Sequence, residues 1–317
     1  MKKTILAASL ASALFAQTQA ANAETIGVSM ALFDDNFLTV LRNGMIEQAE
    51  AMPGVDIQVE DAQNDVARQL DQIKNFAASG VDAIIVNPVD TSATEAMTKA
   101  AQEAGIPLVY VNRQPINVDS LPDNQAFVAS NEIESGTLET FEICKNLRAA
   151  GKGDGARAYV MMGELSNQAA VQRTKDIEDI LATDMCNFIE VIDKQTAMWS
   201  RDRAQDLMTN WLSSGEPFDA VIANNDEMAI GAIQAMKAAG IDMASVEVGG
   251  VDATQDALMA MANGELDVTV FQNAAGQGAG ALGAALKLAK GEDVAQKVYI
   301  PFELVTPANL SSYFSKN

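Results

Sequence analysis

Polar and aromatic side chains follow the β-branched runs of this 317-residue sequence at most of the places where those runs end. Two of these side chains are carboxylates, two are guanidinium groups, three are amides and two are aromatic rings. Carboxylates and amides pair with hydroxyl groups, guanidinium groups donate hydrogen bonds to them, and aromatic rings cover C–H surfaces. Such a combination favours recognition of a small neutral polyol. The candidate residues are Asp35, Phe37, Asn112, Arg113, Arg173, Trp199, Asn225, Asp252 and Gln272.

Two other interpretations of these residues stay open. Phe37 and Trp199 are equally explained as packing residues of a core, because aromatic side chains are mostly used that way. Asp35 and Asp252 form the one carboxylate pair that suggests a glycosidase. The many amides at strand ends resemble recognition more than acid–base chemistry, and nothing in the sequence positions a nucleophilic water. An enzyme is therefore not expected.

The composition excludes several kinds of chemistry. The chain has no histidine, which removes Ser-His-Asp and Cys-His catalysis and the commonest metal ligand. No glycine-rich phosphate loop accompanies the first strand, since GVSMALFDDNF lacks GxGxxG, and no GxxxxGK[ST] occurs. We interpret the glycine clusters at 149–155 and 274–280 as turns and close packing. The sequence predicts no cofactor and no metal.

Short apolar runs alternate with amphipathic helical patterns along most of the chain, and after Ser130 the alternation starts again. Such an alternation predicts parallel sheets that helices cover on both faces. We therefore expect an α/β protein with two Rossmann-like, doubly wound lobes. Ligands of such folds bind beyond the carboxyl ends of the strands. The predicted strands are 25–30, 55–61, 83–87, 108–112, 158–163, 188–193, 220–224, 246–252 and 268–272.

The sequence of one predicted strand occurs twice in nearly the same form. VDAIIVN at 81–87 returns as FDAVIAN at 218–224, and each copy follows a helix-like segment that ends in Ser-Gly. The repeat indicates that the two lobes are copies of one unit. Asn87 and Asn224 end the copies, and each is explained as well by a structural turn as by a ligand contact.

The first 23 residues are expected to be a signal peptide. A basic start precedes the apolar run ILAASLASALFA, which is too short to cross a bilayer, and Ala21-Asn22-Ala23 fits a cleavage site. The mature chain would then begin at Glu24, free in the periplasm. A buried helix or a membrane anchor is the alternative, and the absence of a cysteine after the run argues against a lipid anchor.

Charge and cysteine content also limit the partners. With 43 acidic and 21 basic residues the net charge is −22, so nucleic acid and anionic lipid would repel the chain. The only thiols are Cys144 and Cys186, and two cysteines of an exported protein are expected to pair. Two buried free thiols remain the alternative.

Several segments resemble one known family. The stretches are DNFLTVLRNG (35–44), NPVDTSA (87–93), VNRQ (111–114), ANNDEMAIGAI (223–233) and GVDATQDA (250–257). They resemble the periplasmic sugar-binding proteins of the ribose-binding type, which serve ABC importers. The resemblance implies two lobes joined by a three-segment hinge, a ligand held between them, and presentation to an inner-membrane permease. It implies a first lobe of 24–130 plus 273–302 and a second of 131–272 plus 303–317.

The resemblance marks the same nine residues as sugar contacts, with three departures. Asn112 stands where the family usually has Asp, Leu38 replaces a frequent aromatic residue, and Trp199 replaces the Phe of ribose binders. VYVNRQP (109–115), GELSNQAAVQRTKDI (163–177) and LMTNWLSSG (207–215) resemble most the binders of inositol and rhizopine. We therefore expect a monomeric receptor for a cyclitol. A receptor for a pentose or hexose that feeds a chemoreceptor or sensor kinase is the alternative; a repressor would need a DNA-binding segment in place of the signal peptide.

Overall fold

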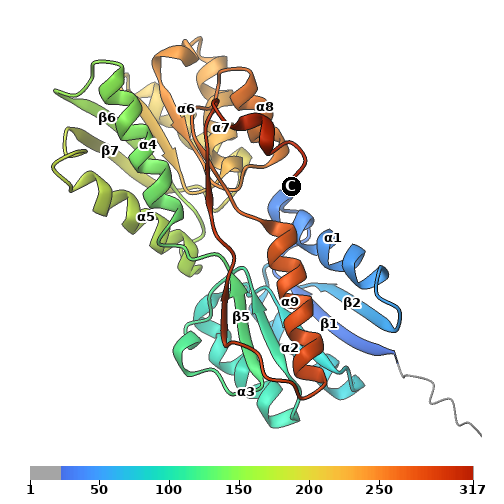
Figure 1. Ribbon diagram of the computed structural model, residues 1–317. Helices are drawn as coiled ribbons and strands as arrows, with labels where there is room; N and C mark the ends of the chain where they lie inside the picture. The colour runs from blue at the N-terminus through green and yellow to red at the C-terminus, as the bar shows by residue number, and fades with distance from the viewer. Residues whose placement is uncertain (1–22, 317) are drawn as a thin grey trace, which may run out of the picture.

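The chain folds into two α/β lobes that lie one above the other (Figure 1). The computed structural model describes residues 23–316, so the expected signal peptide lies outside the described residues apart from Ala23. Within the described part, no helix combines the length and apolarity needed to cross a membrane.

The lower lobe in Figure 1 is built on a six-stranded parallel sheet. Its strand order is β11-β5-β4-β3-β1-β2. The strands are β1 (Glu24–Met30), β2 (Val55–Asp61), β3 (Ala83–Val86), β4 (Leu108–Val111), β5 (Gln125–Ala129) and β11 (Lys297–Tyr299). Helices α1 (Asn36–Glu50), α2 (Val66–Ser79), α3 (Thr94–Ala104) and α9 (Ala274–Ala289) pack around it. The helices bury β3 and β4 completely, as their unbroken apolar sequences predict.

The upper lobe repeats this topology. Its parallel sheet has the order β7-β6-β8-β9. Two isolated β-bridges place β10 next to β9, in the parallel direction. The strands are β6 (Ala156–Met162), β7 (Ile189–Thr196), β8 (Ala220–Ala223), β9 (Glu247–Gly249), β10 (Thr269–Phe271) and β12 (Glu303–Val305), and the helices are α4 (Ser135–Ala149), α5 (Gln168–Leu181), α6 (Arg201–Ser213), α7 (Asp226–Ala238) and α8 (Gln255–Ala262). β3 and β8, the two copies of the repeated strand, take the same place in their sheets. The predicted fold class is confirmed.

The sequence prediction missed three strands. β11 and β12 have three residues each, which are too few to show a period. β5 has five buried residues, QAFVA, and is longer than β3 and β4, so its length does not explain why it was missed. β5 pairs with β4 and β11, and β12 pairs with β10. The partners of β11 and β12 lie far away along the chain. The strand predicted at 246–252 is also shorter, because β9 ends at Gly249.

The chain passes between the lobes three times. It leaves the lower lobe after β5, returns to it between β10 and α9, and leaves again between β11 and β12. α9 packs on α1 and the first sheet, whereas β12 pairs with β10 of the upper lobe. These contacts agree with the division at residues 130, 272 and 302, which we retain as a proposal.

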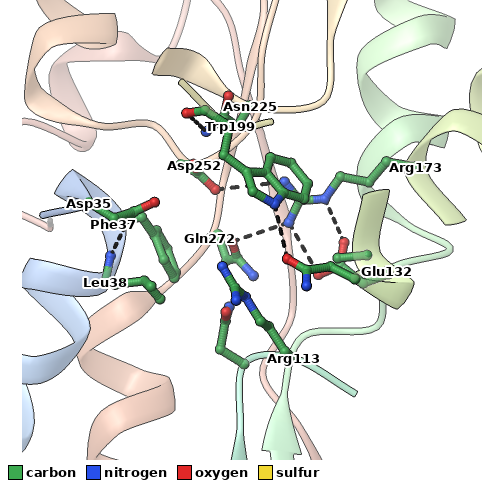
Figure 2. Close-up of a pocket in the computed structure, with 13 residues that line it drawn as sticks. Asp35, Phe37, Leu38, Arg113, Glu132, Arg173, Trp199, Asn225, Asp252 and Gln272 are labelled. Atoms are coloured by element: carbon green, nitrogen blue, oxygen red, sulfur yellow. Dashed lines mark hydrogen bonds and ion pairs between the residues drawn. The ribbon is translucent and has the colours of Figure 1, made fainter. Parts of the chain in front are cut away.

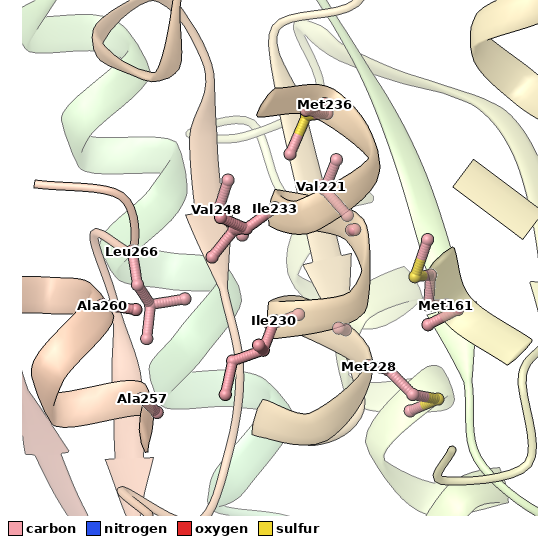
Figure 3. Packing of buried hydrophobic residues seen from close by; sticks show 14 of the residues in the cluster. Met161, Val221, Met228, Ile230, Ile233, Met236, Val248, Ala257, Ala260 and Leu266 are labelled. Atoms are coloured by element: carbon pink, nitrogen blue, oxygen red, sulfur yellow. The ribbon is translucent and has the colours of Figure 1, made fainter. Parts of the chain in front are cut away.

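The core of the upper lobe is rich in methionine. Met228, Ile233 and Met236 of α7 pack with Met161 of β6 and Val221 of β8, and each is at most 2% exposed (Figure 3). Unbranched thioether side chains fill irregular gaps between a sheet and a helix. The packed core holds α7 so that its N-terminus faces the lower lobe.

The structure pairs Cys144 of α4 with Cys186, which precedes β7. The two Cα atoms are 5.7 Å apart and both residues belong to the upper lobe. The bridge therefore constrains one lobe and does not join the two.

We expect the double variant Cys144→Ala/Cys186→Ala to lose about 2–4 kcal/mol of stability, because the bridge limits the unfolded chain. Ligand affinity at 25 °C should stay within about twofold of the parent, since no pocket contact changes. Urea unfolding and calorimetric titration measure the two quantities. A tenfold loss of affinity in the folded variant would contradict this separation.

Candidate ligand-binding site

All nine residues predicted from the sequence line one pocket between the lobes (Figure 2). Each follows the carboxyl end of a strand, where the loops of the two sheets face each other. Counting all space between its atoms, the pocket holds about 410 Å³, part of which is open to solvent. This volume falls within the range of sites that enclose small ligands.

Asp35 and Phe37 enter the pocket from the start of α1. Asp35 is the N-cap of this helix, and its Oδ1 accepts a hydrogen bond of 2.8 Å from the amide of Leu38. Burial raises the pKa of Asp35, although the Leu38 amide and Arg113 oppose the shift. Phe37 is 7% exposed and belongs to both the core and the pocket wall. Its contact with a ligand stays a prediction.

Arg113 lies in the loop after β4. Its Nη1 donates to the carbonyl of Pro88 at 2.9 Å, which orients the guanidinium toward the pocket. Burial lowers the pKa of Arg113, while Asp35 and Glu164 oppose that shift. A desolvated guanidinium gains more than an exposed one from an added hydrogen-bond acceptor.

Asn112 is held by the protein itself. Its Nδ2 donates to Gln277 at 3.2 Å, and its Oδ1 accepts from Asn87 at 3.3 Å. A carboxylate at position 112 could not make the first of these bonds, since it has no N–H to give. The amide that departs from the family pattern therefore matches its neighbour Gln277.

Arg173 of α5 is the central cation of the pocket. Its Nε and Nη2 bind Glu132 at 2.7 and 3.1 Å, and its Nη1 donates to the carbonyl of Asn224 at 2.7 Å. Nη1 also lies 3.8 Å from Asp252. Burial disfavours the charge, but Glu132, Asp252 and Glu139 hold the pKa of Arg173 above its ordinary value.

Trp199 lies in the loop before α6, with φ = 64°. It precedes Ser200, the N-cap of α6, and the helix itself starts at Arg201. The indole lies against Gly163, where an added Cβ would be 2.3 Å from the ring, and its Nε1 donates to Asn167 at 3.0 Å. Trp199 is half-buried, packs against the core of the upper lobe and also lines the pocket, so its contact with a ligand stays a prediction.

Asn225, Asp252 and Gln272 close the pocket on the side of the upper lobe. Asn225 is the N-cap of α7, and Gln272 accepts a hydrogen bond of 3.3 Å from Arg173. Asp252 has φ = 123°, a conformation that costs an L residue energy and that occurs mostly at functional positions. Burial raises its pKa well above the ordinary range; Arg173 opposes the shift, and Asp226, Asp35 and Glu132 add to it.

Four further residues line the pocket without having been predicted as contacts: Leu38, Glu132, Asn167 and Ala169. Leu38 had been noted only as a departure from the family. Glu132 follows β5, the strand that the periodicity missed, so its strand-end position could not be seen. Asn167 and Ala169 lie in the stretch 163–177, which the sequence analysis used only for the resemblance.

The repeated asparagines are structural. Asn87 Oδ1 accepts from the amide of Ala31 after β1, at 3.4 Å. Asn224 Oδ1 accepts from the amide of Gly163 after β6, at 3.0 Å. Both residues are fully buried and neither lines the pocket. Each therefore fastens the loop of the neighbouring strand beneath the pocket.

The lobes touch across the pocket. Asn36 of α1 donates to Glu227 of α7 at 2.7 Å, and the amide of Thr91 donates to the carbonyl of Ser166 at 3.1 Å. Asn167 donates to the carbonyl of Val89 at 3.0 Å. These bonds join residues of different lobes, so the structure is the closed arrangement.

Asp226, at the start of α7, lies fully buried behind the pocket. Its carboxylate accepts from Thr269 at 2.7 Å and from the amide of Thr254 at 2.8 Å. Burial raises its pKa from 3.8 to about 7, although these hydrogen bonds oppose the shift. The folded state then holds a proton that the unfolded chain releases, so stability falls as the pH rises from about 4 to about 7.

We expect Asp226→Asn to remove about 1.4 kcal/mol per pH unit from the slope of stability against pH between pH 5 and 7. The amide keeps the shape of the side chain and can bond with both threonines. Urea unfolding of both proteins at pH 5, 6 and 7 measures the slope. Parallel curves for the variant and the parent would show that Asp226 does not titrate in this range.

The fold and the pocket define a class of protein. Two lobes of equal topology enclose one pocket, and each lobe contributes charged, amide and aromatic side chains to it. Such a pocket encloses a small hydroxylated molecule by closing around it. The architecture is that of a two-lobe solute-binding protein.

Comparisons with known proteins give the family. A family model for the periplasmic binding protein domain matches residues 26–293. Over 317 residues, covering 100% of both chains, the sequence is 65% identical to a protein of Rhizobium meliloti named "Putative rhizopine-binding protein". The chain belongs to the periplasmic binding protein family, as the sequence resemblance predicted.

Two solved structures are also similar. One is an ABC transporter solute-binding protein from Bacillus halodurans C-125 with bound myo-inositol, with a TM-score of 0.87, 42% identity, and coverage of 95% of this chain and 100% of that one. The other is the Caulobacter myo-inositol-binding protein with bound myo-inositol, with a TM-score of 0.81, 29% identity, and coverage of 92% and 96%. The protein is thus a solute-binding protein and not an enzyme, and the glycosidase interpretation falls away.

Proposed function

We propose that this protein is the periplasmic receptor of an ABC importer and that it binds a neutral cyclitol, myo-inositol or rhizopine, between its lobes. The ligand stabilises the closed form because it contacts both lobes at once, and the closed form is presented to an inner-membrane permease. We further propose that the receptor acts as a monomer. One observation carries the proposal. Carboxylates and guanidinium groups from both lobes line a single pocket, together with the indole of Trp199 from the upper lobe.

Within the pocket, the proposed roles follow from the hydrogen-bonding capacity of each residue. Arg113 and Asn225 donate to hydroxyl oxygens, and Asp35 and Asp252 accept from hydroxyl groups. Trp199 covers the C–H face of the ring. Asn112 and Arg173 already bind the protein, so we assign them mainly to the support of their neighbours.

The expected affinity is physically reasonable. A cyclitol has about 12 non-hydrogen atoms, and micromolar binding requires about −8 kcal/mol, or roughly −0.7 kcal/mol per atom. Efficiencies of this size are ordinary for small ligands that are almost completely enclosed.

Calorimetric titration of the mature protein with myo-inositol, ribose, glucose and galactose tests the proposal. We expect myo-inositol to bind and Asp252→Asn to weaken it about 10- to 100-fold, because the amide accepts fewer hydroxyl bonds than the carboxylate. Asn is the suitable replacement, since it tolerates the positive φ of this position better than Ala.

The outcomes separate the ligand from the site. Binding of a pentose or hexose without myo-inositol would show that the cyclitol assignment is wrong, while the receptor class would stand. If Asp252→Asn binds the true ligand like the parent, the role of Asp252 is wrong. Light scattering of the eluting protein measures whether it is a monomer.

A further inference from the structure

Asn167 occupies the N-cap position of α5 but does not cap the helix. Asparagine is among the preferred N-cap residues because its side chain accepts from an amide of the first turn. Every other α-helix of residues 23–316 with an N-cap Asp, Asn, Ser or Thr uses that side chain; these caps are Asp35, Asp65, Ser200, Asn225, Thr254 and Asn273. Asn167 makes no such bond. Its amide is engaged elsewhere.

The two ends of the amide contact different lobes. Oδ1 accepts from Nε1 of Trp199 in the upper lobe at 3.0 Å, and Nδ2 donates to the carbonyl of Val89 in the lower lobe at 3.0 Å. The orientation of the amide follows from its partners, because an indole N–H only donates and a carbonyl only accepts. Asn167 is 1% exposed and lines the pocket. One buried side chain therefore links the indole of the pocket to the opposite lobe.

The neighbouring contacts cross between the lobes at the same place. Thr91 Oγ1 donates to the carbonyl of Ser166 at 3.0 Å and accepts from the amide of Gln168 at 3.1 Å. The carbonyl of Pro88, one residue before Val89, accepts from Arg113 at 2.9 Å. The loop 88–91 is therefore positioned by Arg113 in its own lobe and meets Asn167 when the lobes close.

We propose that Asn167 is a positioning residue that couples the placement of Trp199 on the ligand to closure of the lobes. The proposal rests on the proposed function, since it requires a ligand in the pocket. The ring of a bound ligand stacks on Trp199 and fixes the orientation of the indole. The indole N–H then fixes the side-chain amide of Asn167, which is oriented to donate to the carbonyl of Val89. By thermodynamic linkage, closure equally favours the indole orientation that covers the ligand.

Asn167→Asp separates the two bonds. The carboxylate still accepts from the indole but cannot donate to Val89, and its second oxygen faces that carbonyl. We expect myo-inositol to dissociate about 10- to 100-fold faster and to bind correspondingly more weakly. The melting temperature should not fall, since Asp is a good N-cap and carries favourable charge at a helix N-terminus. Loss of binding in an undiminished fold is a result that a merely structural role would not give.

Three further variants define the roles. Asn167→Ala removes both bonds and should also shift the emission of Trp199, measured in a Trp211→Phe background that leaves one indole in the protein. Thr91→Val removes side-chain bonds between the lobes without removing the bond to Trp199, so it should speed dissociation several-fold and shift that emission less than Asn167→Ala does. Asn210→Ala, the same substitution at an exposed position of α6, should match the parent.

A readout without ligand keeps the inference separate from the proposed function. The amides of Thr91 and Gln168 bond across the lobes, so their hydrogen exchange reports closure directly. Asn167→Asp should speed exchange in the peptides that contain these two residues, whether or not myo-inositol binds. If the parent binds no cyclitol but the variant exchanges faster, the ligand assignment fails and the link between the lobes stands.

The inference is overturned if Asn167→Asp matches the parent both in the exchange of these peptides and in the dissociation rate of myo-inositol. It is also overturned if Asn167→Ala leaves the emission of Trp199 unchanged. Either result would show that the amide bonds are made without affecting closure or the indole.

Discussion

Replacing Arg173 with methionine is expected to lower the stability of the protein by about 3–5 kcal/mol and to abolish measurable binding. Methionine keeps much of the length of the side chain but leaves the buried Glu132 without its bidentate partner. Removing one member of a buried ion pair costs more than the pair contributes, because the remaining charge is desolvated without compensation. Asp252, 3.8 Å from the guanidinium, loses its neighbouring cation as well.

Urea unfolding and titration with myo-inositol measure the two effects of Arg173→Met. Arg68→Met, at an exposed position in the first turn of α2, is the matched control and should change neither quantity appreciably. A variant of Arg173 that unfolds at the urea concentration of the parent would show that Glu132 finds another partner or takes up a proton.

Adding a single methyl group at Gly163 is the second change with a large expected effect. The Cβ of Gly163→Ala would lie 2.3 Å from Cη2 and Cζ2 of Trp199, so the indole must leave its position. It would move into the space of the pocket, because Gly163 lies on its other face. We expect ligand binding to weaken by about 2–4 kcal/mol, or roughly 30- to 1000-fold, from the lost stacking and the strain of overpacking.

Gly155→Ala is the matched control, since Gly155 precedes the same strand at its other end and an added Cβ there meets no atom within 4 Å. It should bind like the parent. If Gly163→Ala binds within threefold of the parent, the strand end is free to move and the indole does not depend on Gly163 for its position.

The strand ends could be predicted from the sequence because a parallel sheet brings them together whatever the details of packing. Asn225 and Asp252 follow β8 and β9, and their positions needed only the order of elements along the chain. The repeated strand likewise predicted two lobes of one topology, since β3 and β8 keep the apolar run that burial on both faces requires.

The remaining features depend on contacts between distant residues. Glu132 was missed because the strand that it follows was missed, although the run QAFVA of β5 is as apolar as its partner β4. The sequence could not decide between a structural and a binding role for Asn87, because it does not show which backbone amides lie close to the side chain. In the structure, the amide of Ala31 donates to Asn87. The sequence position of Asn167 predicts an ordinary N-cap. Its side chain instead donates to the carbonyl of Val89 in the opposite lobe, and this contact can be known only from the structure.

The repeated passage of the chain between the lobes has a consequence for biosynthesis. β11 is an edge strand of the lower lobe and follows the entire parallel sheet of the upper lobe along the chain. A nascent chain emerges from its N-terminus, so the lower lobe cannot acquire α9 and β11 until β6 to β10 have been made. A growing chain therefore holds an unfinished first sheet while it builds the second. β12 then returns to the upper lobe, so each lobe is completed only after part of the other has been made. No single truncation point therefore releases either lobe whole.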